Sequence, residues 1–97
     1  MSQKPIKMRL LEYMSDGIER WSNEIIEVAC REYGISMDNA VSRDYVNFDL
    51  IELAANGFLK DVDEKIDTEG TYKKDALLHK YVITGTGKSR AEAFGRQ

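Results

Sequence analysis

Arg43 and Asn47, near the middle of the chain, carry side chains that can hydrogen-bond to the edges of DNA bases. They lie four residues apart, so in a helix they would share one face. Arginine pairs with guanine, and asparagine with adenine, through paired hydrogen bonds in the major groove. Ser42, beside them, could contact a phosphate. The alternative is that Arg43 pairs with a nearby aspartate and Asn47 is solvated, and the residues themselves leave both interpretations open.

The segment that carries these residues, 42–57, is predicted to be one amphipathic helix. Its apolar side chains recur at spacings of three and four residues and form one stripe: Val46, Leu50, Leu53 and Ala54. Ser42 is the predicted N-cap. Asn56 and Gly57 are the predicted end, because glycine adopts the left-handed conformation that follows many helices at no steric cost. Phe48 falls outside the stripe and is expected to be exposed.

The rest of the chain predicts three more helices and a β-hairpin. Helices are expected over residues 5–15, 22–34 and 88–94, and the two strands of the hairpin over residues 58–66 and 77–84. Ser22 is the predicted cap of the second helix, and Thr84 or Thr86 that of the last. A brief strand at 18–21 is expected to pair with the hairpin, while residues 1–4 are expected to be disordered. The order of elements therefore predicts an α+β fold.

Three lysines outside the central helix are further candidates for phosphate contacts: Lys73, Lys74 and Lys88. The first two lie on the far limb of the hairpin tip, where Tyr72 is also expected to be exposed, and the third opens the last helix. Residues 77–97 carry a formal charge of +3, whereas residues 34–57 carry −3. Acidic side chains also crowd the near limb of the hairpin. In the alternative interpretation the hairpin is a solvated structure without a ligand.

Composition limits the kinds of site that the chain could hold. The 97 residues, with a net charge of −3, are expected to form a single domain over residues 1–97. One cysteine, Cys30, excludes an internal disulfide. With only one histidine, His79, an all-protein zinc site is implausible, so neither a metal nor a cofactor is expected. Cys30 is expected to be a buried small hydrophobe, and His79 a structural or surface residue.

No catalytic or membrane-spanning role is expected. No carboxylate stands beside a basic or nucleophilic partner at a spacing that would build a catalytic site, so the chain is not predicted to be an enzyme. No apolar run is long enough to cross a membrane, and the first residues lack the apolar segment of a signal peptide. These features predict a reduced, cytoplasmic location.

Two sequence patterns resemble those of winged-helix domains. Residues 11–17, LEYMSDG, followed by residues 22–25, SNEI, are similar to the opening of such domains. Residues 53–59, LAANGFL, followed by residues 81–87, YVITGTG, are similar to the segments of such domains that end the third helix and the hairpin. Together the patterns resemble the N-terminal domain of Mrr-type restriction endonucleases. They also resemble small repressors of the multiple-antibiotic-resistance and phenolic-acid types.

This resemblance implies a winged helix-turn-helix fold, namely a three-helix bundle with a β-hairpin wing and a short C-terminal helix. It implies that helix 42–57 enters the major groove of double-stranded DNA while the wing flanks it. It also implies a homodimer formed through the terminal helices. Mrr-type enzymes add a nuclease domain that these 97 residues do not contain, so no DNA cleavage is expected.

Two hypotheses follow for the function. The first is a sequence-specific DNA-binding protein, a small dimeric transcriptional regulator, whose DNA contacts are Ser42, Arg43, Asn47, Lys73, Lys74 and Lys88. The second, favoured by the acidic central helix, is a winged helix that binds a protein partner and does not bind DNA directly. That partner would be a basic protein surface or a nuclease subunit.

Overall fold

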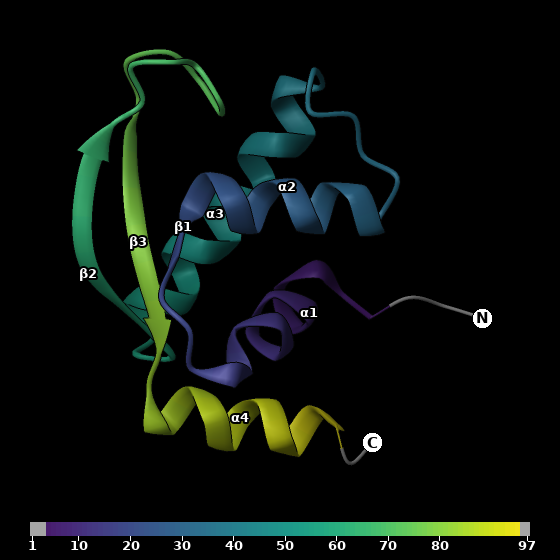
Figure 1. Ribbon diagram of the computed structural model, residues 1–97. Helices are drawn as coiled ribbons and strands as arrows, with labels where there is room; N and C mark the ends of the chain where they lie inside the picture. The colour runs from purple at the N-terminus through teal and green to yellow at the C-terminus, as the bar shows by residue number, and fades with distance from the viewer. Residues whose placement is uncertain (1–3, 96–97) are drawn as a thin grey trace.

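The computed structural model describes residues 4–95, which form an α+β fold with four α-helices and a three-stranded antiparallel sheet (Figure 1). In chain order the elements are α1 Ile6–Tyr13, a short 3₁₀ turn Met14–Asp16, β1 Arg20–Trp21, α2 Ser22–Glu32, α3 Ala40–Ala55, β2 Leu59–Ile66, β3 Leu77–Ile83 and α4 Gly85–Gly95. The α+β class predicted from the sequence is confirmed. The expected disorder of residues 1–4 falls mainly outside the described residues. Lys4 lies within them, and its carbonyl oxygen accepts a hydrogen bond from the Tyr33 hydroxyl.

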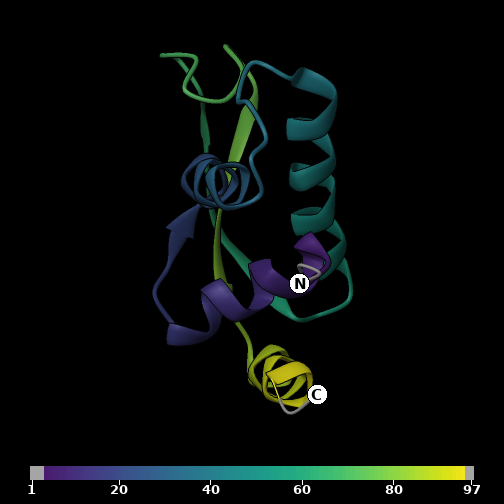
Figure 2. The same cartoon turned by 90° about the vertical axis from the view of Figure 1, so that its right-hand side faces the viewer.

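The sheet has the strand order β1-β3-β2, with every neighbouring pair antiparallel. The predicted brief strand is confirmed, because Arg20 pairs with Tyr81 on β3. Figure 2 shows α3 running alongside the hairpin, while α4 lies at the end of the sheet opposite the hairpin tip, residues 67–76. None of the helices in the described range is long and apolar enough to cross a membrane.

One hydrophobic core joins the helices to the sheet. The predicted stripe of α3 is confirmed, because Val46, Leu50 and Leu53 are buried and Ala54 packs against the core. The other buried members include Leu10, Leu11, Met14, Ile25, Ile26, Cys30, Leu59, Leu78, Tyr81 and Ile83. Burying each of the larger side chains contributes about 1.5–3 kcal/mol, so the packing of these faces is the main source of stability. Cys30 is buried, as expected.

Two of the predicted helix caps are wrong. Helix α3 begins at Ala40, and its N-cap is Asn39, whose side-chain oxygen accepts from the Ser42 backbone N–H at 3.2 Å. Ser22 is not a cap either. It is buried, and its hydroxyl oxygen accepts a hydrogen bond from the His79 backbone N–H at 3.2 Å, which joins α2 to β3. Asparagine and serine are both good caps, so composition alone does not choose between neighbouring candidates.

Helix α4 begins earlier than predicted, and its first turn packs closely on residues 57–58, which follow α3. The Thr84 hydroxyl oxygen, one of the two expected caps, accepts from the Gly87 N–H at 2.9 Å. The same hydroxyl donates to the Gly57 carbonyl oxygen at 2.7 Å. A Cβ atom at Gly87 would lie 2.1 Å from the Phe58 carbonyl oxygen, so only glycine fits there without a backbone shift. At Gly85 a Cβ atom would meet nothing within 4 Å.

Replacing Gly87 by alanine is therefore expected to lower the free energy of unfolding by about 1–3 kcal/mol or more, because the contact is with backbone and does not relax easily. The matched control is Gly85→Ala, which is expected to leave stability unchanged or raise it by up to about 1 kcal/mol, since alanine favours helix. Urea denaturation followed by circular dichroism measures both. Equal effects of the two substitutions would contradict this account of α4 packing.

Candidate functional site

Helix α3 has a second apolar face, which points away from the core. Val41, Tyr45, Phe48 and Ile51 retain exposed fractions of 68%, 69%, 55% and 43%, respectively. Their spacings of four, three and three residues place them on one side of the helix. We call these four side chains the α3 apolar face. The expected exposure of Phe48 is confirmed, and three of the four residues line a shallow hollow together with Asp44.

Arg43, the first candidate for reading bases, turns inward. Its side chain is only 15% exposed, and its Nη1 donates to the Met37 carbonyl oxygen at 3.2 Å. The guanidinium lies over the Tyr72 ring, 4.7 Å from its centroid. Its Nε lies 3.8 Å from Asp44 Oδ1, and within the described residues that buried Nε has no hydrogen-bond partner. Arg43 therefore connects α3 to the preceding loop and to the hairpin tip, and base contact would require it to leave these positions.

Tyr72 is buried, so the expectation that it is exposed is wrong. Its hydroxyl donates to Asp44 Oδ1 at 2.5 Å. Burial, and then the hydrogen bond to Asp44, raise the pKa of Tyr72 to about 12. The ring thus fixes the hairpin tip to the first turns of α3. The two remaining candidates on this helix, Ser42 and Asn47, are partly buried.

The hairpin tip is organised by the buried carboxylate of Asp67. This carboxylate accepts hydrogen bonds from the backbone N–H groups of Thr71, Tyr72 and Lys73 at 3.0, 2.8 and 2.9 Å. The Thr71 hydroxyl donates to it as well. Burial by itself would raise the pKa of Asp67, but these donors stabilise the charged form and lower it to about 2.

The three candidate lysines do not lie on one surface. Lys73 and Lys74 are exposed on the hairpin tip. Lys88 is also exposed, but it belongs to α4, at the opposite end of the sheet (Figure 1). There it borders a hollow shared with Glu12 and Ser15. A single duplex lying along α3 and the tip would meet the first two lysines and not the third.

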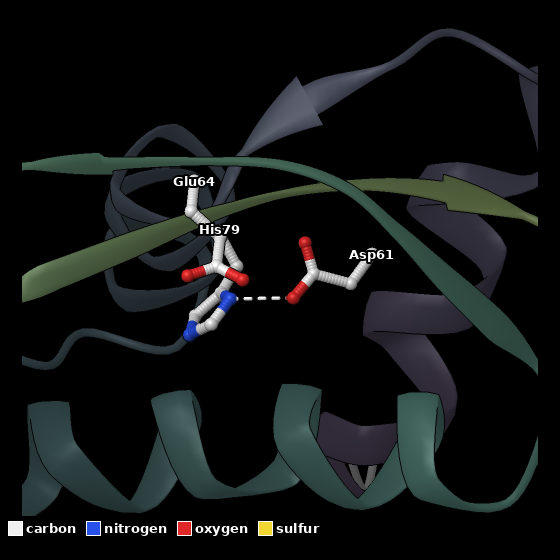
Figure 3. Close-up of side chains that lie close together, drawn as sticks. All are labelled: Asp61, Glu64 and His79. Carbon is white, nitrogen blue, oxygen red and sulfur yellow. Dashed lines mark hydrogen bonds and ion pairs between the residues drawn. The ribbon is translucent and has the colours of Figure 1, made fainter.

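A cluster that the sequence analysis missed lies on the hairpin itself. Asp61, Glu64 and His79 lie on the same side of the two strands, and His79 Nδ1 is 2.5 Å from Asp61 Oδ2 (Figure 3). His79 also stacks on Tyr81, with ring centroids 5.9 Å apart. Two strand residues three positions apart are expected on opposite faces, so no sequence pattern brought Asp61 and Glu64 together.

No protein-family model, curated protein or solved structure matches this chain.

The Asp67 carboxylate should leave a measurable pH dependence. Its pKa is about 2 in the folded chain and about 4 when unfolded, so its contribution to stability is complete above about pH 4 and is lost as the pH falls toward 2. We expect Asp67→Asn to be less stable than the wild type at pH 7 and to lose less stability over that acid interval. Urea titrations at a series of pH values measure this. Glu69→Gln, on the same tip, is the control and should keep the wild-type profile.

Proposed function

We propose that this chain is a winged helix-turn-helix domain that uses α3 to bind a partner protein. The order of its elements supports this fold, with a brief strand before α2 and a hairpin directly after α3. The position of β3 at the centre of the sheet agrees with it as well. In such a domain α3 is the helix that projects its outer face toward a ligand.

The observation that carries the proposal is the α3 apolar face. Two aromatic rings, Tyr45 and Phe48, remain more than half exposed next to Val41 and Ile51. Leaving so much apolar surface in water forgoes the stabilisation that burial would bring. Adjacent exposed aromatics of this kind are typical of the central contacts of protein interfaces.

The charges near this face argue against a DNA duplex as the ligand. Arg43 is engaged with Met37 and Tyr72. Asp44 lies in the hollow beside Val41, Tyr45 and Phe48, and its negative charge would face phosphates at a cost. DNA-binding surfaces gain most of their affinity from positive side chains that neutralise phosphates.

The same charges define the chemistry of the partner. An amphipathic helix or strand with an apolar stripe would cover Tyr45 and Phe48. A lysine or arginine beside that stripe would meet the exposed carboxylate of Asp44. We therefore assign to α3 a protein partner that presents an apolar surface with basic side chains at its edge.

The competing function is DNA binding through the hairpin tip, where Lys73 and Lys74 are exposed on a backbone held by Asp67. It predicts that a mixed-sequence duplex is retarded in a mobility-shift titration at low salt, and that salt or a Lys73→Ala/Lys74→Ala double variant abolishes the retardation. This result, together with equal peptide affinities of the Phe48→Ser variant and the wild type, would overturn the protein-binding proposal.

The direct test uses two designed helical peptides, one of leucine and lysine and one of leucine and glutamate, titrated into the ¹⁵N-labelled chain. We expect the basic peptide to shift the backbone amide resonances of α3 and the acidic peptide to leave them unchanged. Phe48→Ser should weaken binding of the basic peptide by about 30-fold, the effect of removing a central interface contact.

Ile18→Ser is the matched control, because Ile18 is 54% exposed and lies outside the α3 apolar face. It should bind the peptide like the wild type. The same affinity for Phe48→Ser and the wild type would contradict the proposal, since attraction by net charge alone does not depend on that ring. Sedimentation of the free chain identifies a second copy as occupant if a dimer forms and Phe48→Ser dissociates it.

A further inference from the structure

The cluster on the hairpin brings together three side chains that ligate metal ions. Asp61 and Glu64 come from β2 and His79 from β3. One potential ligand atom from each lies within 4.8 Å of the others. Figure 3 shows the two carboxylates and the imidazole gathered on the same side of the strands. The cluster is partly open to solvent, with side-chain exposures of 34% for Asp61 and 25% for His79.

A β-bulge creates this arrangement. Asp61 pairs with Tyr81, but the next pair is Asp63 with Lys80, so Val62 is an extra residue in β2. In a regular strand Asp61 and Glu64 would point to opposite faces. The extra residue reverses the alternation, and Glu64 then stands directly opposite His79. Bulges commonly redirect a side chain in this way beside functional sites.

The charges in the cluster are not balanced by the protein. Within residues 4–95, neither carboxylate forms an ion pair with a lysine or arginine, and the only ion-pair partner of Asp61 is His79. Two carboxylates thus share one small region with a single imidazole. A cation bound between them would relieve their mutual repulsion.

We propose that Asp61, Glu64 and His79 form a binding site for a divalent transition-metal cation of the Zn²⁺ type. An imidazole nitrogen suits zinc and related metals, whereas magnesium and calcium prefer oxygen ligands alone. With three protein ligands, a tetrahedral ion keeps a position for water or for a side chain of a partner. The ion takes the place of the hydrogen between His79 Nδ1 and Asp61 Oδ2, and the neutral ring then carries its proton on Nε2. The two ligand atoms move apart to about 3.3 Å, the spacing of two ligands on one tetrahedral zinc ion.

This site is independent of the α3 apolar face, and it changes the expectation drawn from composition. One histidine and one cysteine are too few ligands for a closed structural zinc site, in which cysteine and histidine supply all four positions. A mixed site can combine one histidine with carboxylates, provided that the fold brings two acidic side chains to the same face. The bulge in β2 supplies them here.

The single histidine makes the test unambiguous, because His79 supplies the only imidazole resonances of the chain. The untagged protein is titrated with ZnCl₂ while the ring nitrogens of His79 are followed by ¹H–¹⁵N NMR, and calorimetry gives the stoichiometry. We expect the ring nitrogens to shift and to saturate at one equivalent of Zn²⁺. MgCl₂ should leave them unchanged.

Glu64→Gln is the decisive variant, because the Glu64 carboxylate has no ion-pair partner within the described residues and its loss breaks no such contact. It should bind Zn²⁺ at least about 10-fold more weakly, since even the loss of an outer-shell partner has such an effect. Glu69→Gln removes the same charge from the hairpin tip and should bind like the wild type. Unshifted His79 resonances in the wild type, or equal affinities of Glu64→Gln and Glu69→Gln, would overturn the assignment.

Discussion

The arrangement of the hairpin tip against α3 depends on one buried carboxylate. The Asp67 carboxylate accepts hydrogen bonds from three consecutive backbone N–H groups, and the turn that these bonds stabilise directs Tyr72 toward α3. Tyr72 in turn holds Asp44 by a hydrogen bond and supports the Arg43 guanidinium on its ring. Through this chain of contacts, a turn far along the sequence holds Arg43 against the body of the protein. An arginine that is drawn inward leaves the aromatic rings as the dominant feature outside.

The division of α3 into an inner and an outer face could be predicted from the sequence only in part. The inner stripe followed from the spacing of Val46, Leu50 and Leu53, which is an amphipathic pattern that burial alone requires. The charge of Arg43 predicts a position at the surface. Yet it lies three residues before Val46 and seven before Leu50, on the buried side. Its partner, Tyr72, lies in the hairpin tip, so no local sequence pattern around Arg43 predicts the contact.

The hairpin shows a second limit of inference from sequence. Alternation over residues 77–84 predicts β3, with residues 58–66 as the other hairpin strand, but the extra residue at Val62 changes which side chains share a face. A bulge depends on the pairing between two strands, so the sequence of β2 alone does not indicate whether one is present. The cap of α3 has the same character, because Asn39 and Ser42 are equally suitable by type and the fold selects the first. Patterns of period and composition thus located the elements, while contacts between elements decided their outer surfaces.

The bulge has a further consequence for the behaviour of the chain at high concentration. Strand β2 lies at the edge of the sheet, and seven of its eight residues are exposed. A flat, exposed edge is a template on which other copies add strands, and this leads to aggregation. The extra residue interrupts the regular row of backbone donors and acceptors, and the charged side chains of β2 discourage a second strand from approaching. The irregularity that gathers Asp61 and Glu64 beside His79 therefore also guards the open edge of the sheet against intermolecular β-pairing.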